Sequence, residues 1–495
     1  MMEAVNRQDD RSVPASRWIL LTGPLGALLL LQLTRISKIA VYLDAVDRSG
    51  LIYAVPFAAA AAMLVIIRYP RLSLHLLAVM LPFNFVGGYY DNSTLLILAK
   101  IGVAMLSLAA LLSTSIAPAA NRAWMTRTAL GQSALLWLAF VGMAVAIGFF
   151  GANRQYWVRE SWWMTFFTAI LPFGTLMRGR RHLERLLWSI CAGVAALQVY
   201  AFWLVATGNR YQRPDAWEGG STFFRAPYSC QNLFVLYLAG AALLHYAYTR
   251  ELSRWKGTLL AAVVAVLGGG LLASMTRSLW LSAAAGLIVL LTQVRWDRRV
   301  VRACFLLAGG VVVSVVVVAL VDRLSAESSG DWLGSAGSFL ADLTSKDSAS
   351  RVTRLMEWSN ALDVWRQSPI VGMGFGYPYP EIDLGKLADS LIPDLFYMHN
   401  SYLNILAKAG IAGLGALLLV TWKAVAAARD LGRREGADAF DQILGNALVA
   451  GLIQISVLSL TMPVLTAGDG AAYFGMLVGM TAAAATPRLA RDHLS

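Results

Sequence analysis

The apolar residues of this sequence gather in long runs that follow one another along most of the chain, and this pattern restricts the fold more than any other feature. A helix needs roughly 17 to 25 mostly apolar residues to cross the hydrocarbon core of a bilayer, and about fourteen runs meet that length. Of all residues 58% are hydrophobic and only 14% are charged, which leaves too little polar surface to cover a soluble globule. The sequence therefore predicts an all-α polytopic membrane protein with about 12–14 transmembrane helices.

The runs also define the expected organisation of the chain. They lie at residues 18–34, 51–67, 72–88, 93–113, 129–150, 161–177, 186–206, 231–248, 257–275, 278–294, 302–321, 400–424, 442–462 and 469–486. Grouped by these runs, the chain has five expected parts: a cytoplasmic tail (1–17), a transmembrane block of about 11 helices (18–321), an outer insertion (322–397), a second block of about three helices (398–486) and a cytoplasmic tail (487–495).

Basic residues are distributed as expected for a membrane protein whose N-terminus lies inside. The net charge of +12 comes from arginine and lysine clusters that fall in alternate loops, where cations are retained on the cytoplasmic side. These clusters include Arg68 and Arg71 near one loop, Arg298 and Arg299 in another, and Arg433 and Arg434 in a third. The basic balance is thus explained by topology, and no nucleic-acid partner is expected.

The outer insertion is too long to be a plain connection and is expected to have its own structure. Apolar residues recur at helical spacing from 351 to 366, which predicts an amphipathic helix on the membrane or on the bundle. Ser368 and Pro369 should end this helix, and a turn should follow at the glycine triplet Gly372, Gly374 and Gly376. The triplet lacks a following lysine, so a nucleotide site is not expected.

Among the five histidines, only His399 lies on the outer side in this topology. An imidazole is well suited to accept a proton near neutral pH, and polar groups at membrane depth are functional by default. Helical spacing would place His399 and Tyr402 on one face, with Asn400 on the neighbouring stripe. The alternative reading is that His399 and Asn400 merely cap the helix and hydrogen-bond a loop.

Arginines on the outer side form a second group of candidates. Outer loops gain nothing topologically from arginine, whereas the guanidinium group matches the geometry of phosphate. The candidates are Arg154, Arg159, Arg210, Arg213, Arg225, Arg277, Arg351, Arg354 and Arg366. For any one of them an ion pair or a solvated rim charge is the simpler reading. Arg277 is the exception, because it lies in a very short turn with few acids nearby.

Metal chemistry has weak support in the sequence. Glu381 and Asp383 could together hold a divalent ion, but two carboxylates alone are a common feature of loops. No metal site and no cofactor are therefore expected.

The segment from Arg351 to Gly413 resembles the signature region of the O-antigen ligase and Wzy-type polymerase superfamily. The resemblance lies in a basic helix with a tryptophan, a proline, the glycine triplet, a His-Asn-x-x-Leu entry to a helix, and glycines a few turns later. In this sequence these are Arg351, Trp358, Pro369, Gly372/Gly374/Gly376, His399-Asn400-Ser401-Tyr402-Leu403 and Gly410/Gly413. The turn Thr276-Arg277-Ser278 is similar to the Ser-Arg-Ser element of the family.

The resemblance implies a multi-pass protein of the bacterial inner membrane that transfers glycan on the periplasmic face from an undecaprenyl-pyrophosphate carrier. The acceptor would be a glycan or the lipid A-core, and the reaction would be inverting and metal-independent. His399 would be the general base, and Arg277 would stabilise the leaving pyrophosphate. Arg225 would be a second phosphate ligand, although Ser221-Thr222-Phe223-Phe224-Arg225 departs from the family pattern.

A transporter of an anionic solute or lipid is the alternative function. Such a protein should place paired ionisable groups and broken helices near the bilayer midplane. Few polar residues lie within the runs, Lys100 and Lys408 being the main candidates, and this favours the enzyme.

Overall fold

The structure, a computed structural model, consists of helices joined by turns. It describes residues 69–86, 106, 107, 110–115, 117–151, 154–206, 228–249, 251, 253–274, 276–293, 296–305, 308, 309, 312, 349–379, 398–466 and 469–486. No strand occurs in these ranges, and all of them belong to one compact unit, Ala62–Ser495. The all-α prediction is therefore confirmed.

Five of the described helices are long and apolar enough to cross a membrane. They are α7 (Ala129–Gly151), α11 (Cys230–Thr249), α12 (Arg254–Ala273), α17 (Ser401–Arg433) and α18 (Ala439–Leu458). Three shorter helices have an apolar core: α3 (Pro70–Val86), α13 (Arg277–Thr292) and α19 (Asp469–Ala485). Each overlaps a predicted run, which confirms a polytopic membrane protein. The runs at 18–34 and 51–67 lie outside the described residues.

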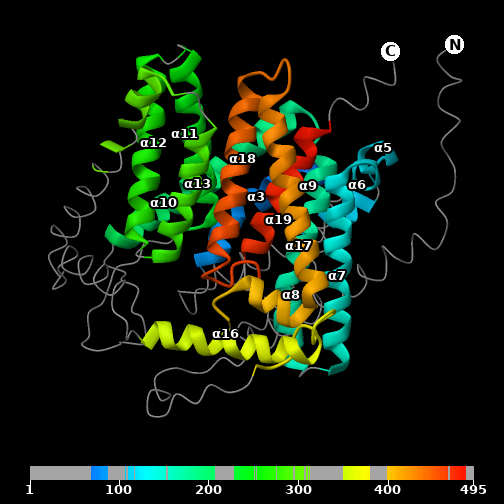
Figure 1. Ribbon diagram of the computed structural model, residues 1–495. Coiled ribbons are helices and arrows are strands. Elements are labelled where there is room, and N and C mark those ends of the chain that lie inside the picture. The colour runs from blue at the N-terminus through cyan, green and yellow to red at the C-terminus, as the bar shows by residue number, and fades with distance from the viewer. Residues whose placement is uncertain are drawn as a thin grey trace, which may run out of the picture. The chain divides into compact units, whose positions relative to one another are not determined.

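Helix α18 is surrounded by other helices, because it packs against α11, α13 and α17 (Figure 1). Helix α19 is buried over nearly its whole length, since small residues such as Ala471 and Ala472 allow neighbouring helices to approach closely. Helix α7 instead exposes large apolar side chains, including Leu136 and Phe150. Its composition and exposure suit a surface that faces lipid.

The predicted run 161–177 is divided among three elements and is not one helix. Helix α8 (Arg154–Met164) leads into a 3₁₀ segment (Thr165–Ala169), which continues as α9 (Ile170–Leu176). The start of α8 is tied to the end of α7 because the indole N–H of Trp157 donates to the Val145 carbonyl at 2.7 Å. Hydropathy does not show this division, because the apolar residues continue through all three elements.

One end of the bundle, which we call the basic end, joins the termini of five helices. Arg178 follows α9 and donates to the Thr486 carbonyl at 3.5 Å. Arg434 follows α17 and donates to the Ala485 carbonyl at 3.3 Å, at the end of α19. Arg180, at the start of α10 (Arg180–Ala206), pairs with Asp438 before α18. Basic residues that the sequence assigned to one side of the membrane therefore meet in space.

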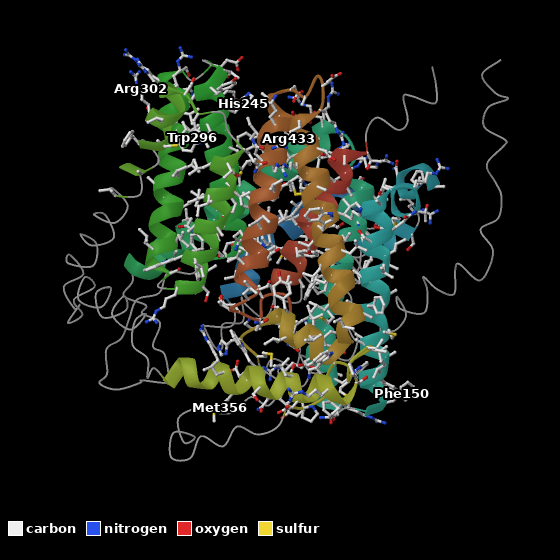
Figure 2. All side chains as sticks on the ribbon, viewed as in Figure 1. Phe150, His245, Trp296, Arg302, Met356 and Arg433 are labelled. Atoms are coloured by element: carbon white, nitrogen blue, oxygen red, sulfur yellow. The ribbon has the colours of Figure 1, made fainter. Side chains whose placement is uncertain are left out.

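The opposite end, which we call the insertion end, carries α16 (Ala349–Gln367). This helix runs crosswise to the bundle and packs on α17 (Figure 1). In Figure 2, Arg302 and Arg433 lie at the basic end, whereas Met356 and Phe150 lie at the insertion end. The helix predicted at 351–366 is thus confirmed, and it lies against the bundle. Its expected amphipathic character is not, because Leu355 is exposed and Glu357 is buried.

Candidate functional site

His399 directly precedes helix α17 and is not part of it. Asn400 is the N-cap, with extended backbone, and its side-chain oxygen accepts a hydrogen bond from the Leu403 N–H at 3.0 Å. Asn400 therefore does what a capping residue does. The expectation that His399 and Tyr402 share a helical face is wrong, because His399 lies before the first helical turn.

The first turn of α17 is fastened to the segment between α18 and α19. The Ser401 N–H donates to the Ser459 carbonyl at 2.9 Å, and the Ser401 hydroxyl donates to the Met462 carbonyl at 3.0 Å. The Tyr402 hydroxyl donates to the Ser456 carbonyl at 3.0 Å. These bonds fix the backbone next to His399. Substrate binding by Asn400 or Tyr402 stays a prediction.

A glutamate of the insertion contacts His399 at three points. The ring Nδ1 of His399 lies 2.9 and 3.0 Å from the two carboxylate oxygens of Glu357, and the His399 backbone N–H donates to Glu357 Oε2 at 2.9 Å. The Glu357 side chain is 8% exposed, whereas that of His399 is 33% exposed. The carboxylate is thus buried behind a ring that solvent can still reach.

Glu357 is not among the residues predicted from the sequence, and its position on α16 shows why it is buried. On α16 it shares one face with Ala361 and Val364, and all three residues are buried. This spacing of three and four residues places a carboxylate on the packed face of a helix. A buried acid needs a partner, so the burial that the structure shows indicates a role for Glu357.

The glycine triplet is inserted into a break in α17. At Gly410 the backbone has a φ of +69°, and the regular hydrogen bonds of the helix are interrupted there. Four hydrogen bonds fill the break: Met373 N–H to Ala407 O (3.0 Å), Gly374 N–H to Lys408 O (2.9 Å), Ile411 N–H to Pro369 O (2.9 Å) and Ala412 N–H to Ile370 O (3.2 Å). The turn therefore satisfies the backbone groups that the break exposes.

A buried ion pair lies beside this junction. Lys408 Nζ is 3.3 Å from Glu160 Oε2, and the side chains are 0% and 9% exposed. Lys408 also donates to the Tyr377 carbonyl, and Glu160 accepts from the Gly376 N–H. The pair therefore connects α17 and α8 with the last glycine of the triplet and with Tyr377 after it.

Arg277 lies at the insertion end as the first residue of α13, and it is half-buried. Helix α13 packs against α18, where Ser282 and Gln454 are joined by a hydrogen bond of 3.4 Å. The two helices run in opposite directions, because Trp296, which follows α13, lies at the basic end (Figure 2). Arg277 and Ser459 each lie five residues from that contact, which is about 7.5 Å along a helix axis. Arg277 thus lies at the same height along the bundle as Ser459. The Ser459 carbonyl accepts a hydrogen bond from Ser401, which is two residues after His399.

The structure shows less about the other predicted arginines. Arg154 and Arg159 lie on α8 with exposed side chains. Arg351 belongs to α16, but its side chain is outside the described part. Arg210, Arg213 and Arg225 lie outside the described residues, as do Lys100 and the acidic residues Glu381 and Asp383. Their predicted roles stay predictions.

The arrangement can support base chemistry at an end of the bundle that also carries a cationic group. A carboxylate can only accept hydrogen bonds, so the Nδ1 contact places the imidazole proton on that nitrogen when the ring is neutral. The lone pair then resides on Nε2, the atom that a general base uses. Arg277 supplies a positive charge at the same end of the bundle.

Part of the chain matches a known protein family. Residues 260–418 match the model of the family described as O-antigen ligase. The matched range contains Arg277, Glu357, His399 and the break at Gly410. No curated protein matches the sequence.

Proposed function

Because residues 260–418 match the O-antigen ligase family model, we propose that this chain is a membrane glycosyltransferase of the O-antigen ligase and Wzy-type polymerase superfamily. Its donor would be a glycan on undecaprenyl pyrophosphate, and its acceptor would be a hydroxyl of a second glycan or of the lipid A-core. The reaction would take place at the periplasmic face of the bacterial inner membrane. One observation carries the proposal: the helix contacts bring Arg277 and His399, both inside the matched range, to the same end of the bundle.

In the proposed reaction, His399 Nε2 takes the proton of the acceptor hydroxyl as its oxygen attacks the anomeric carbon of the donor. The bond from that carbon to the carrier phosphate breaks, and its electron pair leaves with the pyrophosphate. Arg277 stabilises the charge that develops on this leaving group. Because the attack and the departure occur on opposite faces of the carbon, the anomeric configuration is inverted.

Arginines outside the reacting centre would hold the carrier pyrophosphate before reaction. Arg154 and Arg159 on α8 have exposed side chains. Arg210, Arg225 and Arg351 are proposed for the same role from the sequence. Asn400 and Tyr402 would line the acceptor side, in addition to the contacts that they make in the fold.

The experiment that tests the proposal is transfer from a purified undecaprenyl-pyrophosphate glycan to candidate acceptors by the detergent-solubilised protein. We expect His399→Ala to lower the turnover rate by about 10²–10⁴, the range for loss of a general base. We expect Arg277→Ala to lower it by roughly 10²–10³, the range for loss of a charge-stabilising group. The acceptor that reacts would separate a ligase from a polymerase.

Matched controls come from the basic end of the bundle. His245→Ala and Arg302→Ala remove the same side chains far from the insertion end (Figure 2), so both should leave transfer unchanged. Full activity of His399→Ala, with the controls also active, would refute the proposed base.

Two features expected of a transporter are present, namely a broken helix and a buried ion pair. Their polar groups, however, bond to other parts of the chain. The four backbone groups freed near Gly410 bond to the glycine turn and the residues before it. Lys408 and Glu160 pair with each other. The features that would bind a solute are thus used to fasten the insertion, which favours the enzyme.

A further inference from the structure

We propose that Glu357 is the positioning residue for His399, so that the reactive base is assembled from the insertion and the bundle together. This inference rests on the proposed function and adds a residue that the sequence analysis did not assign. The observation behind it is the set of three contacts of 2.9 to 3.0 Å between one carboxylate and one histidine.

The contacts hold both the ring and the backbone of His399. The bond from the backbone N–H fixes where the residue lies, and the bond from Nδ1 fixes the rotation of the ring and its tautomer. A protonated Nδ1 leaves the lone pair of the neutral ring on Nε2. The same logic holds for the buried aspartate of serine protease triads, whose amide substitution leaves the geometry intact but gives the wrong tautomer.

Charge gives Glu357 a second task during the reaction. When Nε2 takes the proton of the acceptor hydroxyl, the ring becomes an imidazolium. The positive charge then lies about 3 Å from a buried carboxylate, where the low local dielectric strengthens the attraction. The proton stays on Nε2 and Glu357 stays ionised, so the glutamate is not itself an acid or a base in the step.

The site combines a residue of the insertion, Glu357, with a residue just before a bundle helix, His399. Its helix, α16, belongs to the insertion, and Ala361 and Val364 on the same face pack with Met398 beside His399. The turn after α16 is fixed in the break of α17 by backbone hydrogen bonds. An insertion that is not seated in this break cannot present its carboxylate to the ring.

The test compares Glu357→Gln with Asp363→Asn. Both changes convert a carboxylate on α16 to an amide, but Asp363 is 51% exposed and pairs with Arg366 at 2.5 Å. A glutamine has one acceptor oxygen for the two donors of His399, and its NH₂ group can donate to Nδ1. We expect Glu357→Gln to lower kcat by about 10²–10⁴ with the donor KM unchanged, and Asp363→Asn to leave both constants unchanged.

A second measurement reads the tautomer directly and does not need activity. In ¹⁵N spectra of protein labelled at histidine, the His399 signals are identified by their loss in His399→Gln. We expect a proton on Nδ1 in the neutral wild-type ring and a shift toward the Nε2-protonated form in Glu357→Gln. Asp363→Asn should give the wild-type spectrum.

The outcomes separate this inference from the proposed function. If the wild type transfers glycan and His399→Ala does not, but Glu357→Gln keeps the wild-type kcat and spectrum, Glu357 has no positioning role. If the wild type transfers no glycan while the spectra change as expected, the contact is confirmed and the proposed reaction is wrong.

Discussion

At the scale of single residues, the contact with the largest expected effect on stability is the buried ion pair of Lys408 and Glu160. Replacing Lys408 by methionine leaves the Glu160 carboxylate buried without its partner, which we expect to destabilise the protein by about 3–5 kcal/mol. The double variant Lys408→Met/Glu160→Gln removes both charges, so it should be less destabilised than Lys408→Met alone. Denaturant unfolding in detergent measures the wild type, both single variants (Lys408→Met and Glu160→Gln) and the double variant.

The matched control is the exposed ion pair of Arg180 and Asp438 at the basic end, with side chains 56% and 48% exposed. Water screens this pair, so Arg180→Met should change stability by only roughly 0–1 kcal/mol.

A double variant at Lys408 and Glu160 whose loss of stability equals the sum of the losses of the single variants would mean that the two side chains do not interact.

The same residues show what the sequence reveals about a site. His399 could be identified because topology left it as the only outer imidazole, and Arg277 because its turn is so short. Glu357 lies 42 residues from His399, and no pattern along the chain links the two. The pair forms only when α16 packs on the bundle, so the sequence could predict the base but not its partner.

At the scale of elements, the glycine triplet carries the attachment of the insertion. A Cβ atom at Gly374 would lie 2.3 Å from the backbone nitrogen of Gly148 on α7, and the φ of +83° is one that side chains rarely adopt. We expect Gly374→Ala to abolish transfer and to lower the unfolding temperature, because neither backbone can yield without moving a helix.

Gly436 offers the matched control. Its φ of +73° is similar, but a Cβ atom there would meet nothing within 4 Å. Gly436→Ala therefore carries only the left-handed backbone strain of about 1–2 kcal/mol and should stay active. Equal effects of the two substitutions on activity and on unfolding temperature would show that the close approach to Gly148 is unimportant.

Elements were predicted well where periodicity or hydropathy defines them. The helix expected at 351–366 is α16, Ala349–Gln367, and the run 469–486 is α19, Asp469–Ala485. The break at Gly410 was not predicted, because hydropathy averages over a window and a single glycine hardly alters it. Only the contact with the inserted turn makes the break stable, and that contact joins distant parts of the chain.

At the scale of the whole molecule, the arrangement of the two ends was predictable because it follows from charge. Arginines that the sequence grouped on one side hold the termini of α9, α10, α17, α18 and α19 together, while α16 lies at the other end. Which end faces the periplasm is a proposal that rests on the retention of cations in the cytoplasm.

Labelling of single cysteines tests this orientation. Ser359 on α16 and Glu435 after α17 both have exposed side chains, and the background is a variant with Cys191, Cys230 and Cys304 replaced by alanine. In spheroplasts, a maleimide that cannot cross membranes should label Ser359→Cys and should label Glu435→Cys only after the membrane is opened. The reverse pattern would place His399 on the cytoplasmic side. Transfer at the periplasmic face would then be impossible for this site, whatever its activity in detergent.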